Sequence, residues 1–368
     1  MGLLRKGQVI HGTYEVERLV GEGAFAEVYR VKHRFLGRQA MKVFKMVGMT
    51  AEETEQMLGE AIMLSRIGHP NIVRVFDANT TETSKGACGF FTMEYIAGGS
   101  LEQFWKSHGA AFVPVETAVE VIRQVCRGLA VAHAQQPPLV HRDIKPQNIP
   151  VGYDTDGLRA RISDFGLAKR ANPLTLLVSG RGTLPFKPPE VMQDWQADSC
   201  AGDVWALGST LYLLLTDRLP FGDVNASNAR DKGRFEQPLI PASRLNIQVG
   251  GTLDRILARA LAIEPRHRYA TAKELLADLE KWHSEPTNVA KPAYSSNSSG
   301  LSKTALGSQT PADEGLAQQM AKQALDLSRH AGRLKEAADI LEEAFNKWPS
   351  LRERYEYRLT LWRRGVSG

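Results

Sequence analysis

The side chains that could do chemistry concentrate in one stretch, HRDIKPQNIP, which runs from His141 to Pro150. Two permanently basic groups, one carboxylate and two amides fall within it before it ends at a proline. So much fixed polarity in one loop indicates a site that positions and neutralises charged groups. The alternative is a solvated polar turn between helices. That alternative explains this segment alone, but not the DFG at 164–166 that follows a predicted hairpin.

A second candidate site is VGEGAFAEVY at 20–29, which places Gly21 and Gly23 at a turn between two predicted strands. Because glycine lacks a Cβ, backbone N–H groups there can approach a polyphosphate closely. An ordinary β-turn would look the same, so the loop alone is weak evidence. Lys42 then falls in a strand pattern, AMKVF, where a buried lysine is costly unless it is paired. Glu60 on the next predicted helix is a candidate partner; the alternative is two unrelated surface charges.

The elements that must position these side chains fall into two groups. Roughly the first 95 residues predict strands around one helix: TYEVERLV, EVYRVKHRF, RQAMKVFKM and FFTMEYI read as strands, and 51–67 has helical spacing. From Ser100 to about His283 the pattern is mostly helical, interrupted by a polar, Gly/Pro-rich region at 140–190. The sequence therefore predicts a β-rich part followed by a helical part.

The last part of the sequence changes composition. Residues 284–312 contain few apolar side chains and many Ser, Thr, Gly and Pro, which predicts a flexible linker. Residues 313–368 become helical again, and GRLKEAADILEEAFNKWPS within them resembles the second helix of a tetratricopeptide repeat. A plain helical hairpin is the alternative. Because one repeat buries too little to stand alone, the tail is expected to dock on the rest of the chain, on a protein partner or in a longer array.

Composition limits which other classes of protein the chain could belong to. The chain has 368 residues, 43% hydrophobic and 24% charged, and its 46 basic minus 41 acidic side chains give a net charge of +5. That balance is mild and no basic block is interleaved with aromatics, so we expect no nucleic-acid partner. No apolar run is long enough for a membrane span. Three well-separated cysteines without metal-ligand spacing indicate reduced thiols, and the prediction is a cytoplasmic protein.

Taken in order, these motifs resemble those of eukaryotic-like (Hanks-type) protein kinases. GxGxxAxV, AMK, Glu60 ahead of HPNIV, HRDIKPQN, DFG and a PPE triplet share the family's order and spacing over roughly 14–282. The resemblance implies an α+β, two-lobed fold with a β-rich N-lobe, a helical C-lobe and nucleotide between them. The expected boundaries are an N-terminal extension at 1–12, a catalytic domain at 13–283 divided into lobes at 13–96 and 97–283, the linker at 284–312 and the tail at 313–368.

The resemblance also implies roles for single residues. Asp143 would orient the acceptor hydroxyl and receive its proton, while Lys145 would offset the charge of the transferred phosphoryl group. Asn148 would brace Asp143 and hold a metal ion. Asp164 would chelate Mg²⁺, with Mn²⁺ as an alternative. The remaining catalytic residues that it implies are Lys42 and Glu60.

An ATP site between the lobes is implied as well. Glu94 and Ile96 would offer backbone groups to adenine, with Met93 behind it. Pro150 stands where a leucine usually forms the floor of the pocket, so we expect adenine packing to weaken by about 1 kcal/mol while the fold persists. The implied nucleotide-binding residues are Val20, Gly21, Glu22, Gly23, Ala24, Val28, Ala40, Lys42, Met93, Glu94, Ile96 and Pro150.

Other positions are implied as supports or as regulatory sites. Arg142 would bind a phosphorylated activation loop, and the candidate acceptors are Thr175 and Ser179. Glu190 would pair with Arg268. The implied structural supports are Arg142, Thr183, Glu190, Asp203 and Arg268.

The predicted function is transfer of the γ-phosphoryl of ATP to Ser/Thr hydroxyls of protein substrates, with autophosphorylation. KPQN and the segment GTLPFKPPE indicate serine/threonine rather than tyrosine as the acceptor. The alternative is a catalytically weak nucleotide-binding scaffold that recruits partners through its helical tail. A small-molecule kinase is disfavoured, because those enzymes generally lack the GT…PPE segment.

Overall fold

The computed structural model divides into two compact units, Met1–Thr287 and Asn288–Gly368. The division falls within the predicted linker. The structure describes residues 2–23, 25–47, 59, 67–108, 112–154, 157–165, 184–194, 196–222, 233–283, 311–327, 333–348, 351–352, 355, 359 and 362–363.

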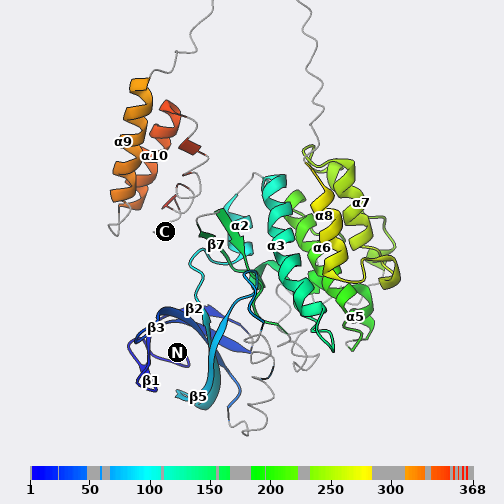
Figure 1. Cartoon of the computed structure of the whole chain (residues 1–368), viewed down its shortest axis with the longest axis horizontal. Helices are drawn as coiled ribbons and strands as arrows, with labels where there is room; N and C mark the ends of the chain where they lie inside the picture. Colours follow the sequence, from blue (N-terminus) through cyan, green and yellow to red (C-terminus); the bar gives the residue numbers. More distant parts are fainter. Residues whose placement is uncertain are drawn as a thin grey trace, which may run out of the picture. The chain divides into compact units, whose positions relative to one another are not determined.

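The N-terminal part of the first unit is a six-stranded antiparallel sheet in the order β1-β2-β3-β4-β6-β5 (Figure 1). Four of its strands coincide with predicted ones, whereas β5, a largely polar segment, was not among them. The helix predicted at 51–67 lies outside the described residues except at Gly59, which is helical, and Ile67. The strands are β1 (Val9–Ile10), β2 (Tyr14–Glu22), β3 (Ala26–His33), β4 (Gly37–Phe44), β5 (Val75–Thr83) and β6 (Gly86–Glu94).

The two faces of this sheet carry different side chains. Val28 pairs with Lys42 and Ala40 pairs with Met93. Since side chains alternate along a strand, these four residues share one face. The opposite face holds a buried core, which the N-terminal segment completes: Leu3 is 1% exposed. The core members are Leu3, Leu4, Ile10, Tyr14, Val16, Tyr29, Val31, Met41, Val43, Cys88 and Phe90.

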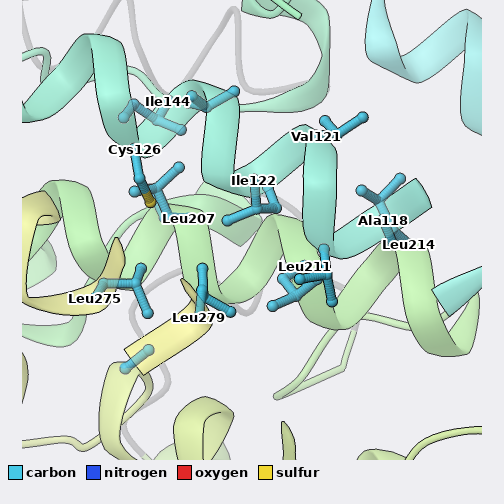
Figure 2. Close-up of a cluster of buried hydrophobic side chains, with 14 of the residues drawn as sticks. Ala118, Val121, Ile122, Cys126, Ile144, Leu207, Leu211, Leu214, Leu275 and Leu279 are labelled. Carbon is cyan, nitrogen blue, oxygen red and sulfur yellow. The ribbon is translucent and has the colours of Figure 1, made fainter. Parts of the chain in front are cut away.

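A mainly helical part follows. Its central helix is α6 (Cys200–Thr216), whose residues from Gly202 onward are all buried. Figure 2 shows side chains of α3 (Val115–His133) and α6 facing each other, with Leu275 and Leu279 of α8 (Ala272–Lys281) against them. The other elements are α2 (Leu101–Ser107), α3 (Val115–His133), β7 (Val151–Asp154), β8 (Gly157–Ala160), α5 (Pro189–Gln193), α7 (Gly251–Ala260) and α8 (Ala272–Lys281), with short 3₁₀ turns at Pro146–Asn148, Leu184–Phe186, Gly233–Phe235, Ala242–Arg244 and Pro265–His267.

The loop of the HPNIV motif joins the two parts. The carbonyl of Asn71 accepts a hydrogen bond from the Ile162 N–H at 2.9 Å, and its side-chain amide donates to the Ala160 carbonyl at 2.9 Å. Helix α3 approaches so closely that a Cβ on Gly128 would lie 2.8 Å from the Asn71 carbonyl oxygen. Only glycine fits that position without a shift. The loop thus fastens the sheet to α3 and to the segment after β8.

The second unit contains α9 (Pro311–Leu327) and α10 (Leu334–Lys347), which pack together. Small residues allow their close approach, and Trp362, 2% exposed, closes the cluster. The buried positions include Leu334, Ala337, Leu341 and Ala344, where the tetratricopeptide resemblance places its signature residues. No helix among the described residues is both long and apolar enough to cross a membrane.

Candidate active site

The segment that precedes Asp143 is held by a carboxylate from α6. Asp203 accepts the backbone N–H groups of His141 at 2.7 Å and of Arg142 at 2.8 Å. His133 Nε2 also donates to Asp203 at 3.0 Å, since its Nδ1 accepts the Ala272 N–H. Burial acts to raise the pKa of Asp203, but the hydrogen bonds from His133 and from the His141 N–H outweigh it and hold that pKa below its ordinary value.

The backbone at this loop adopts an uncommon conformation. Arg142 has φ 70° and Asp164 has φ 63°, both in the left-handed region that a side chain disfavours. Such residues persist only where their surroundings fix them, and they gather at functional sites. Two of the four such non-glycine residues in the described part of the chain therefore fall in the two motifs singled out from sequence.

His141 ties the two motifs together. Its Nε2 donates to the Ser163 carbonyl at 2.8 Å and its Nδ1 accepts the Asp143 N–H at 3.2 Å. Both bonds require a neutral ring with the proton on Nε2. Complete burial favours that form, because it lowers the pKa of His141. The ring also packs against Phe165, with centroids 4.6 Å apart.

The carboxylate of Asp143 receives two donors on one oxygen. Lys145 Nζ lies 2.9 Å from Oδ2, and Asn148 Nδ2 lies 2.9 Å from the same atom. Asn148 also donates to the Asp143 backbone carbonyl at 2.8 Å. The structure therefore brings together the three residues that the HRDIKPQN motif nominated. The Asp143 side chain remains 19% exposed, which leaves it accessible from solvent.

Among the described residues, Lys42 pairs with Asp164. Its Nζ lies 2.6 Å from Asp164 Oδ1, and the two side chains are 12% and 22% exposed. Glu60, the partner expected from sequence, lies outside the described residues. Ser163, next to Asp164, donates both its N–H and its hydroxyl to the Asn148 carbonyl at 3.0 and 3.1 Å. A carboxylate and an amide, both hard oxygen donors of the kind Mg²⁺ takes, are thereby held in neighbouring segments.

The expected nucleotide-binding positions lie along one face of the sheet. Ala40 is 5% exposed, while Val28 and Met93 are half-buried. The Glu94 N–H donates to the Arg74 carbonyl at 2.9 Å. Ile96 approaches β7, where a Cβ on Gly152 would lie 3.0 Å from it.

The glycine-rich turn is open. Among the residues that the structure describes, a Cβ on Gly23 would meet nothing closer than 3.7 Å, and one on Gly21 nothing closer than 4.0 Å. Val20 is 37% exposed, and Glu22 forms an ion pair with Lys45 at 2.6 Å. The described glycines therefore leave room above the strand that carries Val28. Ala24 lies outside the described residues.

Pro150 takes part in the hairpin on one side only. It forms an isolated bridge with Ser100, and its carbonyl accepts the Arg161 N–H at 2.9 Å. Proline has no N–H to return a second bond to Arg161, and β7 begins at Val151. The hairpin nevertheless forms, as expected from sequence.

The remaining support residues meet different outcomes. Arg268 and Glu190 form a two-fold ion pair with both N–O distances at 2.7 Å, and the Arg268 side chain is fully buried. Arg142 Nε lies 3.3 Å from Asp198 Oδ2, a partner that sequence did not nominate. Thr175, Ser179 and Thr183 lie outside the described residues.

Sequence reasoning missed several residues that hold the site. His133 donates a hydrogen bond to Asp203. Gln124 accepts the N–H of Ala160 at the end of β8. Each acts on a partner tens of residues away in the chain, and neither stands in a motif. The only available signal was their presence on the buried side of a long amphipathic helix, which many core residues share.

Comparisons with known proteins agree with this geometry. The protein kinase domain family matches residues 14–280. The serine/threonine-protein kinase PrkC of Bacillus subtilis is 32% identical over 74% of this chain and 41% of its own length. The serine/threonine-protein kinase PknB of Mycobacterium leprae is 31% identical over 80% of this chain and 47% of its own length. This chain thus spans less than half the length of either relative.

Solved structures lead to the same fold. The kinase domain of PknI from Mycobacterium tuberculosis is 26% identical, with a TM-score of 0.55, and the match covers 75% of this chain and 98% of that one. The two-lobed architecture expected from the motifs is therefore confirmed. By the family match over most of its length, this chain belongs to the protein kinase family.

Proposed function

We propose that the chain is an ATP-dependent protein serine/threonine kinase. The observation that carries the proposal is the convergence of Asp143, Lys145 and Asn148 within hydrogen-bonding distance of one another. Lys42 and Asp164 form an adjacent ion pair. Phosphoryl transfer needs little covalent help from the protein but needs positioning and charge neutralisation, which this set offers.

Asp143 is the general base of the proposed reaction. Its carboxylate orients the acceptor hydroxyl and takes its proton as the oxygen attacks the γ-phosphorus, while the bond from that phosphorus to the β,γ-bridging oxygen of ATP breaks and ADP leaves. Lys145 stands beside it as a fixed cation and stabilises the charge on the transferred group. Asn148 limits the rotation of Asp143 through two hydrogen bonds, so the base does not have to be ordered when substrate arrives.

Asn148 and Asp164 would hold the divalent cation that accompanies ATP, through one amide and one carboxylate oxygen. When bound, that cation neutralises phosphate oxygens. Lys42 would exchange its present partner Asp164 for the phosphates, and Val28, Ala40 and Met93 would contact the adenine. The glycines at 21 and 23 would let backbone N–H groups reach the phosphates.

The protein substrate class rests on similarity. Relatives such as PrkC and PknB carry the name serine/threonine-protein kinase. Within this proposal the catalytic domain is residues 13–283, the activation loop is phosphorylated at Thr175 or Ser179, and the tail at 313–368 is a tetratricopeptide-like segment that binds a protein partner. Deletion of the tail is then expected to change oligomeric state or substrate choice without changing the ATP KM.

A phosphate-transfer assay tests the proposal. Purified chain, Mg²⁺ and ATP labelled at the γ-phosphate are incubated with a generic protein substrate, and label on serine and threonine is separated after hydrolysis. The expected result is labelled phosphoserine or phosphothreonine, lost in Asp143→Asn and kept in Asp217→Asn, an exposed carboxylate at the end of α6. Tight ATP binding without any transfer would reject the kinase and support the nucleotide-binding scaffold.

A further inference from the structure

Lys187 is a buried cation that the proposed chemistry does not use. The residue is 6% exposed, in the segment between the 3₁₀ turn at Leu184–Phe186 and helix α5. Its Nζ donates to the backbone carbonyl of Arg142 at 2.5 Å. Burial of an ammonium group costs free energy unless strong acceptors compensate for it. The burial of Lys187 beside residues 141–148, the loop that carries Asp143 and is called the catalytic loop below, points to a role there.

The carbonyl that Lys187 binds belongs to the peptide unit that leads into Asp143. The N–H of the same peptide unit donates to His141 Nδ1 at 3.2 Å. Both polar atoms of this unit are therefore fixed, one by Lys187 and the other by His141. Because a peptide unit is planar, fixing both atoms sets its rotation and the direction in which the Asp143 side chain leaves the backbone.

The fixed peptide unit lies at a conformationally costly position. Arg142 has φ 70°, a region that costs a non-glycine residue on the order of 1 kcal/mol or more. Asp203 holds the N–H groups on the preceding side of Arg142, at 2.7 and 2.8 Å. Lys187 supplies the restraint on the following side. Without it, the peptide unit between Arg142 and Asp143 can rotate toward a more relaxed conformation.

Lys187 itself has a rigid base. Its backbone N–H bonds to the Leu184 carbonyl at 3.1 Å, and two prolines follow it. Just beyond them, Glu190 is bound to the buried Arg268. The hydrogen bond from the Lys187 ammonium to the Arg142 carbonyl therefore links the 184–190 segment to the catalytic loop. The same segment continues directly from the one that carries Thr183.

We propose that Lys187 is a positioning residue for catalysis: it orients Asp143 by holding the Arg142 carbonyl, and so couples the 184–190 segment to the catalytic loop. This inference rests on the proposed kinase function for its kinetic consequence, though not for its structural one. Lys187 lies on the C-lobe side, apart from the sheet face that carries Val28, Ala40 and Lys42. Its loss is therefore expected to lower kcat and to leave the ATP KM unchanged.

The test compares Lys187→Met, which keeps the length of the side chain without the donor, with Lys187→Arg, which keeps a charged donor. Lys281→Met, at a site where the lysine side chain is 78% exposed, is the matched control. We expect Lys187→Met to lower kcat by about tenfold or more, with the ATP KM within about twofold of wild type. Lys187→Arg should recover most of the activity, and Lys281→Met should resemble wild type.

Hydrogen exchange supplies a second readout that needs no activity. In Lys187→Met the amides of His141, Arg142 and Asp143 should exchange faster than in wild type, while those of helix α6 should not. If Lys187→Met does not fold, the same comparison is made with Lys187→Gln. An unaltered kcat together with unaltered exchange at these amides would overturn the inference. Wild-type protein without kinase activity would instead reject the proposed function, and the exchange data alone would then decide the role of Lys187.

Discussion

Replacement of Asp203 by asparagine is the most informative single change outside the reacting groups. The two side chains have nearly the same shape, so the change alters hydrogen bonding rather than packing. In the structure Asp203 Oδ2 accepts the His141 N–H and His133 Nε2, while Oδ1 accepts the Arg142 N–H. An asparagine amide offers one acceptor oxygen in place of two. Its NH₂ group must therefore face at least one backbone donor.

The expected loss in the free energy of unfolding of Asp203→Asn can be worked out from these hydrogen bonds. If the asparagine oxygen replaces Oδ2, the Arg142 N–H meets a second donor and loses its partner, at a cost of about 1–3 kcal/mol. The two retained bonds change from charge-assisted to neutral, which loses about 1 kcal/mol each. The expected loss in the free energy of unfolding is therefore about 3–5 kcal/mol. Because Arg142 precedes the base, kcat should also fall, by about a hundredfold.

Urea denaturation followed by tryptophan fluorescence measures the first effect, with the two units fitted as separate transitions. Asp217→Asn is the matched control, because Asp217 sits at the other end of the same helix, is exposed and has φ 57°, a conformation that asparagine accepts well. Its free energy of unfolding should stay within about 0.5 kcal/mol of wild type. A loss of less than about 1 kcal/mol in Asp203→Asn would refute the reasoning that this carboxylate holds the loop.

Three other changes test separate parts of the structure. Because burial lowers the pKa of His141, its neutral form stabilises the fold fully above pH ~6.5 and progressively less below it. The excess in free energy of unfolding of wild type over His141→Leu should therefore shrink between pH 7.5 and 5.5. An excess that grows on acidification would contradict this. Pro150→Leu should lower the ATP KM by about fivefold if one methylene of adenine contact is restored, and an unchanged KM in steady-state kinetics would reject that account. Arg268→Met leaves the Glu190 carboxylate without its partner and should cost about 3 kcal/mol in urea denaturation, whereas a loss below about 1 kcal/mol would show that the pair is not needed.

Motifs made the fold and much of the site predictable, because the family ties residue type to position. HRDIKPQN contains Asp143, Lys145 and Asn148 within six residues, and their contacts are local. The Glu190–Arg268 pair spans 78 residues, yet the structure brings both partners together as the resemblance implied. The β-rich and helical halves were equally visible in the change of hydrophobic period.

What escaped prediction depends on contacts without a local pattern. Strand β5 is mostly polar, and it becomes a strand because it pairs along its whole length with β6. Within the N-terminal extension expected at 1–12, the Leu4 N–H bonds to the Tyr29 hydroxyl at 3.0 Å and Leu3 lies in the core, contacts that no local pattern indicates. Lys187 reads as an ordinary loop lysine, because nothing near it in sequence indicates that it will lie over the Arg142 carbonyl.

The central claim is that Lys42, Asp143, Asn148 and Asp164 surround one metal-bound triphosphate. A crystal structure of the chain with Mg²⁺ and a non-hydrolysable ATP analogue tests it most directly. We expect the cation to contact Asn148 and Asp164, the Lys42 ammonium to have moved to the phosphates, and adenine to lie against Ala40 and Met93. A nucleotide bound elsewhere, or phosphates out of reach of these side chains at saturating analogue, would contradict the account.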